Sequence, residues 1–163
     1  MSKVYFISDL HLGHKNILNF STERSGNTVL EHDHILVQKW NTVVNKRDVV
    51  YVLGDVCFDI QSMPRLGEMY GGKVLILGNH DKFDLGVYRK YFSKIYGFRT
   101  YKGYWISHAP IHPTELRGRK NIHGHVHNNV IRNCYNEPDS RYIPVCVEQT
   151  NGYPLSFDKI KEI

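Results

Sequence analysis

Five apolar runs in this sequence end abruptly in Asp, Asn or His, most of them beside a glycine. The runs cover residues 3–8, 48–53, 73–77, 104–108 and 120–122. The polar residues at their ends are Asp9, Asp55, Asn79, His108 and His125. Short apolar, β-branched runs predict buried strands. Because ligands bind beyond the carboxyl ends of strands in open α/β sheets, the pattern predicts one cleft that collects these residues.

Helical periodicity separates the first three runs. Residues 31–46 repeat apolar side chains at three-to-four spacing, including Leu36 and Trp40, and predict a helix. Shorter helices are expected at 61–69 and 85–92. This alternation of strand and helix predicts an α/β fold.

The second half of the chain has more strand signals than helix signals. Runs 95–101 and 104–108 flank Lys102-Gly103 and predict a hairpin. A further strand is expected at 142–148, and the polar segment 128–141 is expected to be a surface loop or hairpin. Ser156 is placed to N-cap a short final helix.

Length and composition bound the class of protein. The 163 residues predict a single domain, residues 1–163. The N-terminus is too polar for a secretory signal, no window of the chain predicts a membrane span, and the three cysteines form no CxxC pair, so we expect a cytoplasmic protein. The net charge of +5 suits a phosphate-bearing or polyanionic substrate, although a merely solubilising surface explains it equally well.

Histidine is over-represented, with ten residues, and several of them join the strand-end pattern. Seven residues are candidate metal ligands: Asp9, His11, Asp55, Asn79, His108, His125 and His127. Asp9 and His11, like His125 and His127, are two residues apart, which in extended backbone places both on one side. Nitrogen and oxygen donors without thiolate fit Mn²⁺, Fe, Zn²⁺, Co²⁺ or Ni²⁺ and argue against Ca²⁺ or an iron–sulfur cluster. Seven donors exceed the needs of one ion and fit two ions that share a carboxylate.

Each motif alone also has an ordinary structural explanation. A lone Asp9-x-His11 can cap a strand end, Gly78-Asn79-His80-Asp81 can be a turn, and His125-x-His127 can be a surface cluster. Their occurrence in this order, each at the end of an apolar run, favours a metal site.

The motif set resembles that of the calcineurin-like metallophosphoesterases, and the flanking sequence is similar to small single-domain members from bacteria and bacteriophages. The resemblance rests on Asp9-x-His11, Gly54-Asp55, Gly78-Asn79-His80-Asp81, His108 and Gly124-His125-x-His127. It implies two packed mixed β-sheets flanked by helices. It also implies a hydrolase with a dinuclear centre of divalent ions, Mn²⁺ foremost, with Fe, Zn²⁺, Ni²⁺, Co²⁺ and Mg²⁺ as alternatives.

The resemblance also implies a role for each motif residue. Asp9, His11 and His127 would hold the first ion; Asn79, His108 and His125 would hold the second; Asp55 would bridge them. A metal-bridging hydroxide would attack phosphorus, with Asn79 stabilising charge on the phosphoryl oxygens. His80 would act as general acid on the leaving oxygen, and Asp81 would orient its ring.

The substrate class is less constrained. The short gaps between motifs leave no room for a cap domain, so an open cleft and a phosphodiester of nucleotide or nucleic-acid type are expected. A phosphomonoesterase acting on a small metabolite, or a non-catalytic interaction scaffold, are the alternatives. Phosphoprotein phosphatases of the resembled family carry an Arg soon after the Gly-Asp motif, and Phe58 and its neighbours supply none. His14, Arg24 and His123 are candidate substrate contacts.

Overall fold

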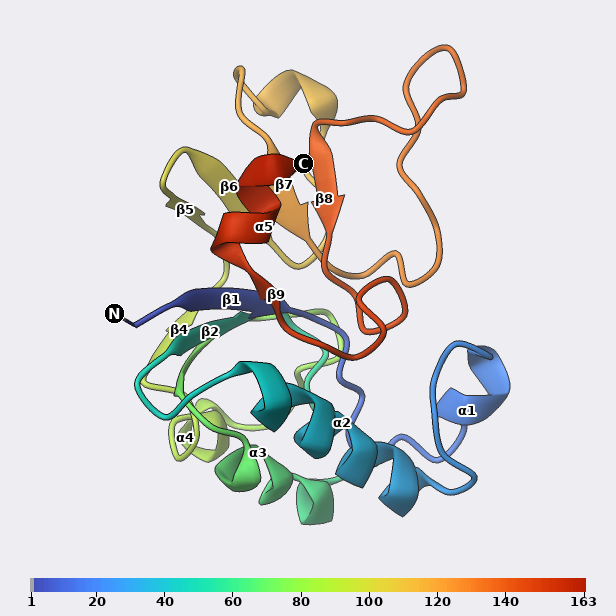
Figure 1. Ribbon diagram of the computed structural model, residues 1–163, viewed down its shortest axis with the longest axis vertical. Helices are drawn as coiled ribbons and strands as arrows, with labels where there is room; N and C mark the ends of the chain where they lie inside the picture. The colour runs from blue at the N-terminus through green and yellow to red at the C-terminus, as the bar shows by residue number, and fades with distance from the viewer. Residues whose placement is uncertain (1) are drawn as a thin grey trace.

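Two mixed β-sheets pack face to face in the computed structural model, which describes residues 2–163 (Figure 1). The first sheet has the order β4-β3-β2-β1-β9. Its strands are β1 (Val4–Ile7), β2 (Val49–Val52), β3 (Gly72–Ile76), β4 (Lys94–Tyr96) and β9 (Leu155–Ser156). Strands β1 to β4 are parallel, and β9 pairs antiparallel with β1.

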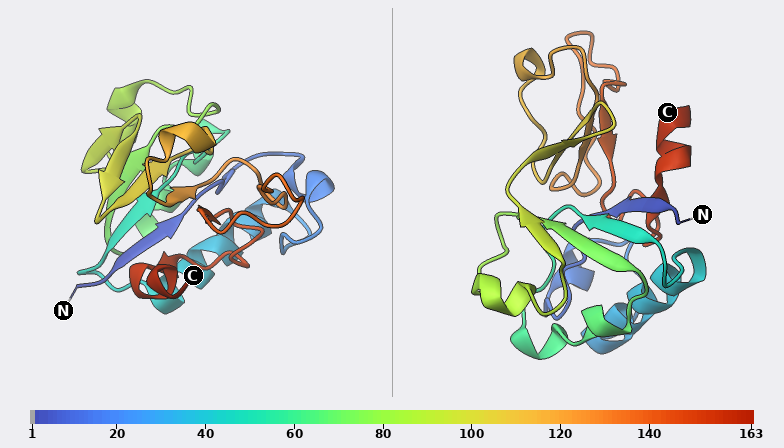
Figure 2. Two further views of the ribbon diagram at one scale, coloured as in Figure 1. Left: turned by 90° about the horizontal axis from the view of Figure 1, so that it is seen from above. Right: turned by 90° about the vertical axis from the view of Figure 1, so that its left-hand side faces the viewer.

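The second sheet has the order β5-β6-β7-β8. Its strands are β5 (Arg99–Tyr101), β6 (Tyr104–Ser107), β7 (Asn121–His123) and β8 (Tyr142–Pro144). The first pair is antiparallel, and the others are parallel. Figure 2 shows this sheet stacked over the first, with the chain crossing between them after β4.

Helices flank the two sheets. They are α1 (Ile17–Phe20), α2 (Val29–Val43), α3 (Arg65–Glu68), α4 (Leu85–Tyr88) and α5 (Phe157–Glu162), with 3-10 turns η1 (Ile60–Ser62) and η2 (Pro113–Glu115). Figure 1 places α2, α3 and α4 below that sheet and α5 beside the second sheet. The predicted fold class, two mixed sheets flanked by helices, is therefore confirmed. Within residues 2–163, none of the helices combines the length and the apolar character that crossing a membrane requires.

Side-chain alternation along β1 explains why the layers form. Tyr5 and Ile7 are buried in the core that includes Trp40 of α2, whereas Phe6 is buried in a second core between the sheets. Phe6 meets Ile122 of the second sheet in that core. A central strand with both faces buried needs apolar residues at successive positions, which is the pattern of the first run.

Several predicted elements are shorter or divided. The helix expected at 61–69 is split into η1 and α3, because Pro64 lies between them and has no N–H to donate. The strand expected at 95–101 is two strands, β4 and β5, that belong to different sheets and are separated by Gly97 and Phe98. The strand expected at 142–148 ends at Pro144, and a single bridge between Ser8 and Cys146 continues it.

Two local predictions are confirmed. Lys102 and Gly103 have φ angles of 44° and 88°, as a tight hairpin turn between β5 and β6 requires. The Ser156 hydroxyl accepts a hydrogen bond from the Lys159 N–H at 3.3 Å and caps α5. Strands β1, β2, β3, β6 and β7 all direct their carboxyl ends toward the predicted ligands that follow them.

Candidate metal centre

The structure brings all seven predicted ligands together at the carboxyl ends of the strands. One group consists of Asp9, His11 and His127, and a second consists of Asp55, His108 and His125. Within each group the donor atoms lie within 4.8 Å of one another. The remaining predicted ligand, Asn79, joins the second group, because its Oδ1 is 2.8 Å from His108 Nε2.

Asp55 lies between the two groups. Its Oδ2 is 3.8 Å from His11 Nε2 in the first group and 3.5 Å from His108 Nε2 in the second. Donors around one ion are roughly 3 to 3.5 Å apart when each metal–ligand bond is about 2.1 Å long. Asp55 is therefore the carboxylate that would be shared if both groups held a cation.

Buried polar atoms without partners identify the place for a cation. Asp9 Oδ1 and both ring nitrogens of His11 are buried and have no hydrogen-bond partner in the structure of residues 2–163. Such atoms cost free energy unless something compensates them, and native proteins contain few of them. Because all three belong to predicted ligands of one ion, the donor set fits a divalent cation.

The backbone of the ligands is strained. Asp9, His11, Asp55, His125 and His127 all have φ between 51° and 72°, the left-handed region. Non-glycine residues seldom adopt it, and each costs on the order of 1 kcal/mol or more. Nine non-glycine residues among residues 2–163 have positive φ, and five of them are predicted ligands. Strain concentrated in this way favours a functional site.

The paired ligands two residues apart converge in a different way from the one predicted. The sequence predicts that Asp9 and His11, like His125 and His127, share one side of an extended segment. Strand β1 ends at Ile7, however, and β7 ends at His123, so both pairs lie in irregular segments beyond the strands. The side chains still converge, because every second residue takes the left-handed conformation.

Glycines beside the ligands permit this close approach. A Cβ at Gly78 would collide with the Asp55 carboxylate, and a Cβ at Gly124 would collide with the Asp9 carboxylate and the Ser8 hydroxyl. Gly78 and Gly124 are therefore needed, because any side chain there would overlap a predicted metal ligand that follows a different strand.

Two of the predicted histidine ligands are oriented by a contact to Nδ1, the ring nitrogen that faces away from the cleft. His108 Nδ1 lies 2.7 Å from the carbonyl oxygen of Leu53, and His127 Nδ1 lies 2.9 Å from Glu148 Oε1. Both contacts leave Nε2 facing the cleft, which is how proteins orient metal-binding imidazoles. Sequence reasoning missed Glu148, although it stands at the end of the predicted strand 142–148 and follows the same strand-end rule.

The carboxylates and imidazoles of the two groups stabilise one another's charges. Burial alone would lower the pKa of His108, but the nearby Asp55 and Asp9 carboxylates raise it to about 9. Burial opposes charge on Asp9, yet the nearby His11 ring, whose Nε2 lies 3.8 Å from Asp9 Oδ1, and the charge of His108 hold the pKa of its carboxyl below the usual range. A cation bound at the second group would have to displace the His108 proton, so we expect its affinity to increase with pH up to about 9.

Arg24 does not fit the substrate contact predicted for it. Its side chain is fully buried, and Nε donates to Glu148 Oε1 at 2.7 Å. The other guanidinium nitrogens donate to the carbonyl oxygens of Leu10 and Asp9. Arg24 therefore holds the backbone of Asp9 and Leu10 in place and pairs with the Glu148 carboxylate. Glu148 is buried, but hydrogen bonding with His127 and the charge of Arg24 lower its pKa to about 2.

His123 does not fit a substrate contact either. The residue is fully buried in β7, where its ring packs edge-on against Tyr142 with centroids 5.8 Å apart. Its Nδ1 lies 2.9 Å from the carbonyl oxygen of Gly124. His123 is therefore a core residue, because the chain turns only after it and exposes His125 instead.

Asp81 has a role other than the one predicted. Its carboxylate accepts hydrogen bonds from the backbone N–H groups of Asp55, Val56 and Gly78, at 2.8 to 3.0 Å. It therefore clamps the turns after β2 and β3 together and makes no hydrogen bond to the His80 ring in the described structure. The side chain that packs against His80 is Phe58, with ring centroids 5.0 Å apart.

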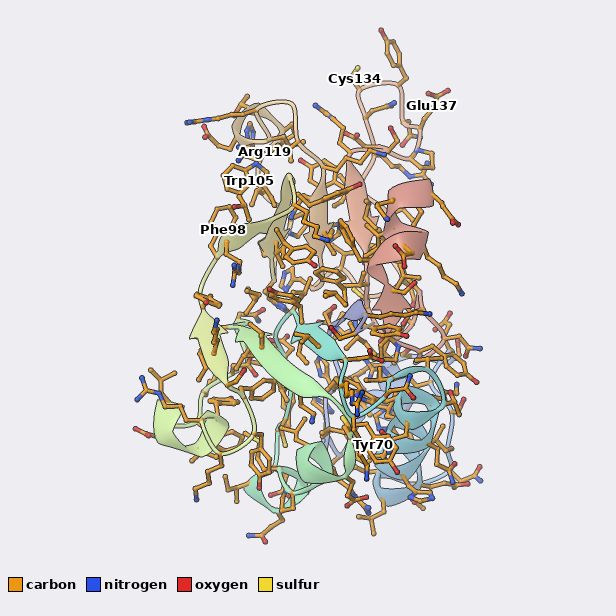
Figure 3. All side chains as sticks on the ribbon, turned by 60° about the vertical axis from the view of Figure 1, so that its left-hand side comes forward. Tyr70, Phe98, Trp105, Arg119, Cys134 and Glu137 are labelled. Carbon is orange, nitrogen blue, oxygen red and sulfur yellow. The ribbon has the colours of Figure 1, made fainter. Side chains whose placement is uncertain are left out.

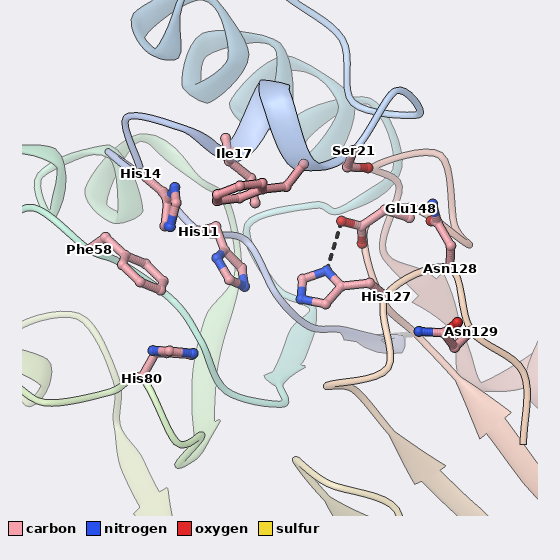
Figure 4. A pocket seen from close by; sticks show the side chains of 11 residues that line it. His11, His14, Ile17, Ser21, Phe58, His80, His127, Asn128, Asn129 and Glu148 are labelled. Carbon is pink, nitrogen blue, oxygen red and sulfur yellow. Dashed lines mark hydrogen bonds and ion pairs between the residues drawn. The ribbon is translucent and has the colours of Figure 1, made fainter.

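An open pocket of about 550 Å³ adjoins the first group (Figure 4). His11, His14, Phe58 and His80 form one side, and His127, Asn128 and Glu148 form the other. Phe58 stacks on His11 at 4.8 Å and meets His14 edge-on at 4.3 Å. His14, a candidate substrate contact, therefore lines this pocket. Phe58 also lines the pocket, a position that the sequence did not predict.

Comparisons with known proteins identify relatives without assigning an activity. No model of a known protein family matches the chain. It is 33% identical to the uncharacterized protein MJ1445 of Methanocaldococcus jannaschii, in an alignment that covers all of the chain and 92% of the relative. The chain belongs to the same family as this archaeal protein.

Other similarities are partial or structural. The Gene 66 proteins of Mycobacterium phages L5 and D29 are 40% and 38% identical over about half of the chain, and the matches cover 41% and 42% of the phage proteins. A crystal structure of AQ665, a protein of unknown function from Aquifex aeolicus, aligns with a TM-score of 0.79 and 26% identity over 99% of both chains. The chain thus shares its fold with a solved protein whose function is unknown.

One testable prediction concerns Glu148. Glu148→Gln removes the carboxylate behind His127 and leaves the Arg24 guanidinium buried without its counter-charge. Loss of such a supporting contact lowers metal affinity about 10- to 100-fold, and an unpaired buried charge lowers the free energy of unfolding by ~3–5 kcal/mol. Calorimetric titration with Mn²⁺ and denaturant unfolding measure the two effects. Glu137→Gln, on the exposed loop, is the matched control, and Mn²⁺ affinity within twofold of wild type in Glu148→Gln would contradict the assigned role.

Proposed function

We propose that this chain is a dinuclear, metal-dependent phosphoesterase of the calcineurin-like metallophosphoesterase type. The observation that carries the proposal is the position of Asp55 Oδ2, within 4 Å of a histidine nitrogen from each of the two ligand groups. The unpaired buried atoms of Asp9 and His11 and the strained ligand backbones support it. The order of motifs along the chain supports the same assignment.

Two divalent ions bound by these groups would neutralise phosphoryl oxygens and activate water for attack on phosphorus. The chain itself orients the donors. Asp55 supplies the shared carboxylate, and its Oδ1 accepts the His80 backbone N–H at 2.9 Å. The exposed Asn79 side chain presents its amide to the cleft, where its NH₂ group can donate to a phosphoryl oxygen.

His80 is the proposed proton donor to the leaving oxygen. Its side chain is exposed at the cleft, and its ring lies 6.2 Å from that of His11 and 5.0 Å from that of Phe58. The backbone hydrogen bond to Asp55 fixes its position relative to the proposed bridging ligand. Packing against Phe58, instead of a carboxylate partner, sets the orientation of the ring.

The proposed substrates are phosphodiesters of nucleotide or nucleic-acid type. The pocket beside the first group is open, and Phe58, Phe20 and Ile17 give it an apolar side near the polar ligands. A phosphate with substituents on two sides can lie across such a cleft, with a base against the aromatic side.

Hydrolysis of bis-p-nitrophenyl phosphate tests this proposal. We expect turnover with added Mn²⁺ and its abolition by EDTA. A parallel panel of p-nitrophenyl phosphate, cyclic nucleotides and dinucleotides separates diester from monoester preference. Absence of turnover on every ester, with metal bound to a folded chain, would favour a non-catalytic protein of the same fold.

A further inference from the structure

The positive charge of the chain is concentrated in one segment. Residues 94–120 contain six of the 21 Lys and Arg residues but only one of the 16 acidic residues. The segment thus carries +5, the net charge of the whole chain, and the remainder is neutral. Its single acid, Glu115, pairs with Arg117 at 3.2 Å.

This segment forms one side of the molecule. Strand β4 is the edge of the first sheet and β5 is the edge of the second, and only Gly97 and Phe98 separate them in sequence. Both edges therefore lie on the same side, which faces the viewer in the right-hand view of Figure 2. Lys94 and Thr100 are exposed along these edges.

Aromatic side chains are interleaved with the cations. The Phe98 ring stacks on Trp105 with centroids 4.9 Å apart and an interplanar angle of 24°, and 47% of Phe98 is exposed. The Arg119 guanidinium lies 4.9 Å from the Trp105 ring on the outer face of the second sheet. The Arg99 guanidinium lies 4.5 Å from the Tyr96 ring and 5.7 Å from the buried Tyr51 ring, on the side of β5 that faces the first sheet. Figure 3 shows Phe98, Trp105 and Arg119 following one another along the outer side.

The indole of Trp105 is fixed in place. Its Nε1–H donates to the carbonyl oxygen of Leu116 at 3.0 Å, so the ring does not need a ligand to hold its orientation. The exposed surface of Phe98 thus sits on a rigid support. A preformed aromatic surface between cations has the two features that single-stranded nucleic acids bind, since bases stack on rings and phosphates contact Lys and Arg.

We propose that this surface, named here the edge platform and formed by Lys94, Phe98, Trp105 and Arg119, binds single-stranded DNA or RNA. A base stacks on Phe98, and the neighbouring cations contact the flanking phosphates. The edge platform contains none of the candidate metal ligands, so its binding does not depend on the proposed hydrolysis.

The edge platform is also close to the metal centre along the strands. Tyr96 pairs with Ile76, three residues before Asn79, and Arg99 pairs with Ile106, two residues before His108. At about 3.3 Å per residue, these separations are roughly 7 to 10 Å. A strand bound there would therefore lie near the cleft, and, resting on the proposed function, we infer that nucleic acid is the substrate of the phosphoesterase.

Fluorescence anisotropy of labelled oligo-dT and oligo-U of about 12 nucleotides tests the proposal, with EDTA present to prevent cleavage. Phe98→Ala, and Phe98→Leu, which keeps an apolar side chain, are expected to bind about 5- to 100-fold more weakly. Arg119→Ala is expected to reduce the slope of log affinity against log salt by about 0.7. Tyr135→Ala, at a side chain that is 80% exposed, and Lys159→Ala on α5 are the matched controls and should bind as wild type.

Several results would overturn the proposal. One is the absence of oligonucleotide binding, and a second is unchanged binding by the Phe98 and Arg119 variants. A third is an equal loss of affinity in Lys159→Ala, which would show that binding depends only on the net charge of the chain. Binding of phosphatidylserine vesicles or polyglutamate through the edge platform without oligonucleotide binding would assign a different partner. Hydrolysis of bis-p-nitrophenyl phosphate should be unchanged in all these variants, so failure here is distinguishable from failure of the proposed activity.

Discussion

Asp55→Asn is expected to lower Mn²⁺-dependent phosphodiester hydrolysis by more than about 100-fold, the upper limit seen when only a supporting residue is lost. The substitution keeps the shape of the side chain and removes the charge that both ligand groups approach. An amide oxygen cannot serve two cations as a carboxylate does, so the bound metal should fall from two ions to at most one. Activity assays and elemental analysis of the same preparation measure the two effects together.

The control for Asp55→Asn is the same chemical change at an exposed position. Asp84 caps α4 by accepting the Gly86 N–H at 2.6 Å, and Asn caps helices equally well. Asp84→Asn should therefore keep both metal and activity. Two ions still bound to Asp55→Asn, in a chain with the circular dichroism of wild type, would show that Asp55 does not bridge the centre.

His80→Ala is expected to keep both ions and lose about 10²- to 10⁴-fold in turnover on an ester with a poor leaving group. The reason is that His80 is placed beside the cleft without belonging to either ligand group. An alkoxide leaving group, as in a dinucleotide, needs a proton, whereas p-nitrophenolate leaves without one. The loss should therefore be much smaller on bis-p-nitrophenyl phosphate.

His34→Ala, at an exposed position on α2, is the matched control and should behave as wild type on both esters. Equal losses for His80→Ala on the good and the poor leaving group would indicate substrate positioning by His80 in place of proton donation. Loss of metal in His80→Ala would make it part of the centre and contradict the assignment.

Much of the site was predictable because its residues follow strands. An apolar run that stops at an Asp, Asn or His marks a strand end in the sequence itself, and parallel strands bring such ends together. The two packed sheets were implied by the family resemblance, and the structure confirms the fold class. Short elements such as α1 and β9 were not predicted, because four and two residues carry no periodic signal.

The remaining features depend on contacts between distant segments. Arg24 is buried against Glu148, which lies 124 residues away in the sequence. The residues next to Arg24 in the sequence do not distinguish it from an Arg that binds substrate. The Asp81 carboxylate was expected to face His80, but three backbone N–H groups from two turns bind it. Phe58 acquires a role only because the turn after β2 carries it between His11, His14 and His80.

We propose that two cations held around Asp55 make this chain a phosphoesterase. Titration of the metal-free chain with Mn²⁺, with bound metal and hydrolysis of bis-p-nitrophenyl phosphate followed in the same samples, tests it most directly. We predict saturation at two ions per chain, with most of the activity appearing as the second ion binds. Saturation at two ions without hydrolysis, or full activity with one ion, would contradict the claim.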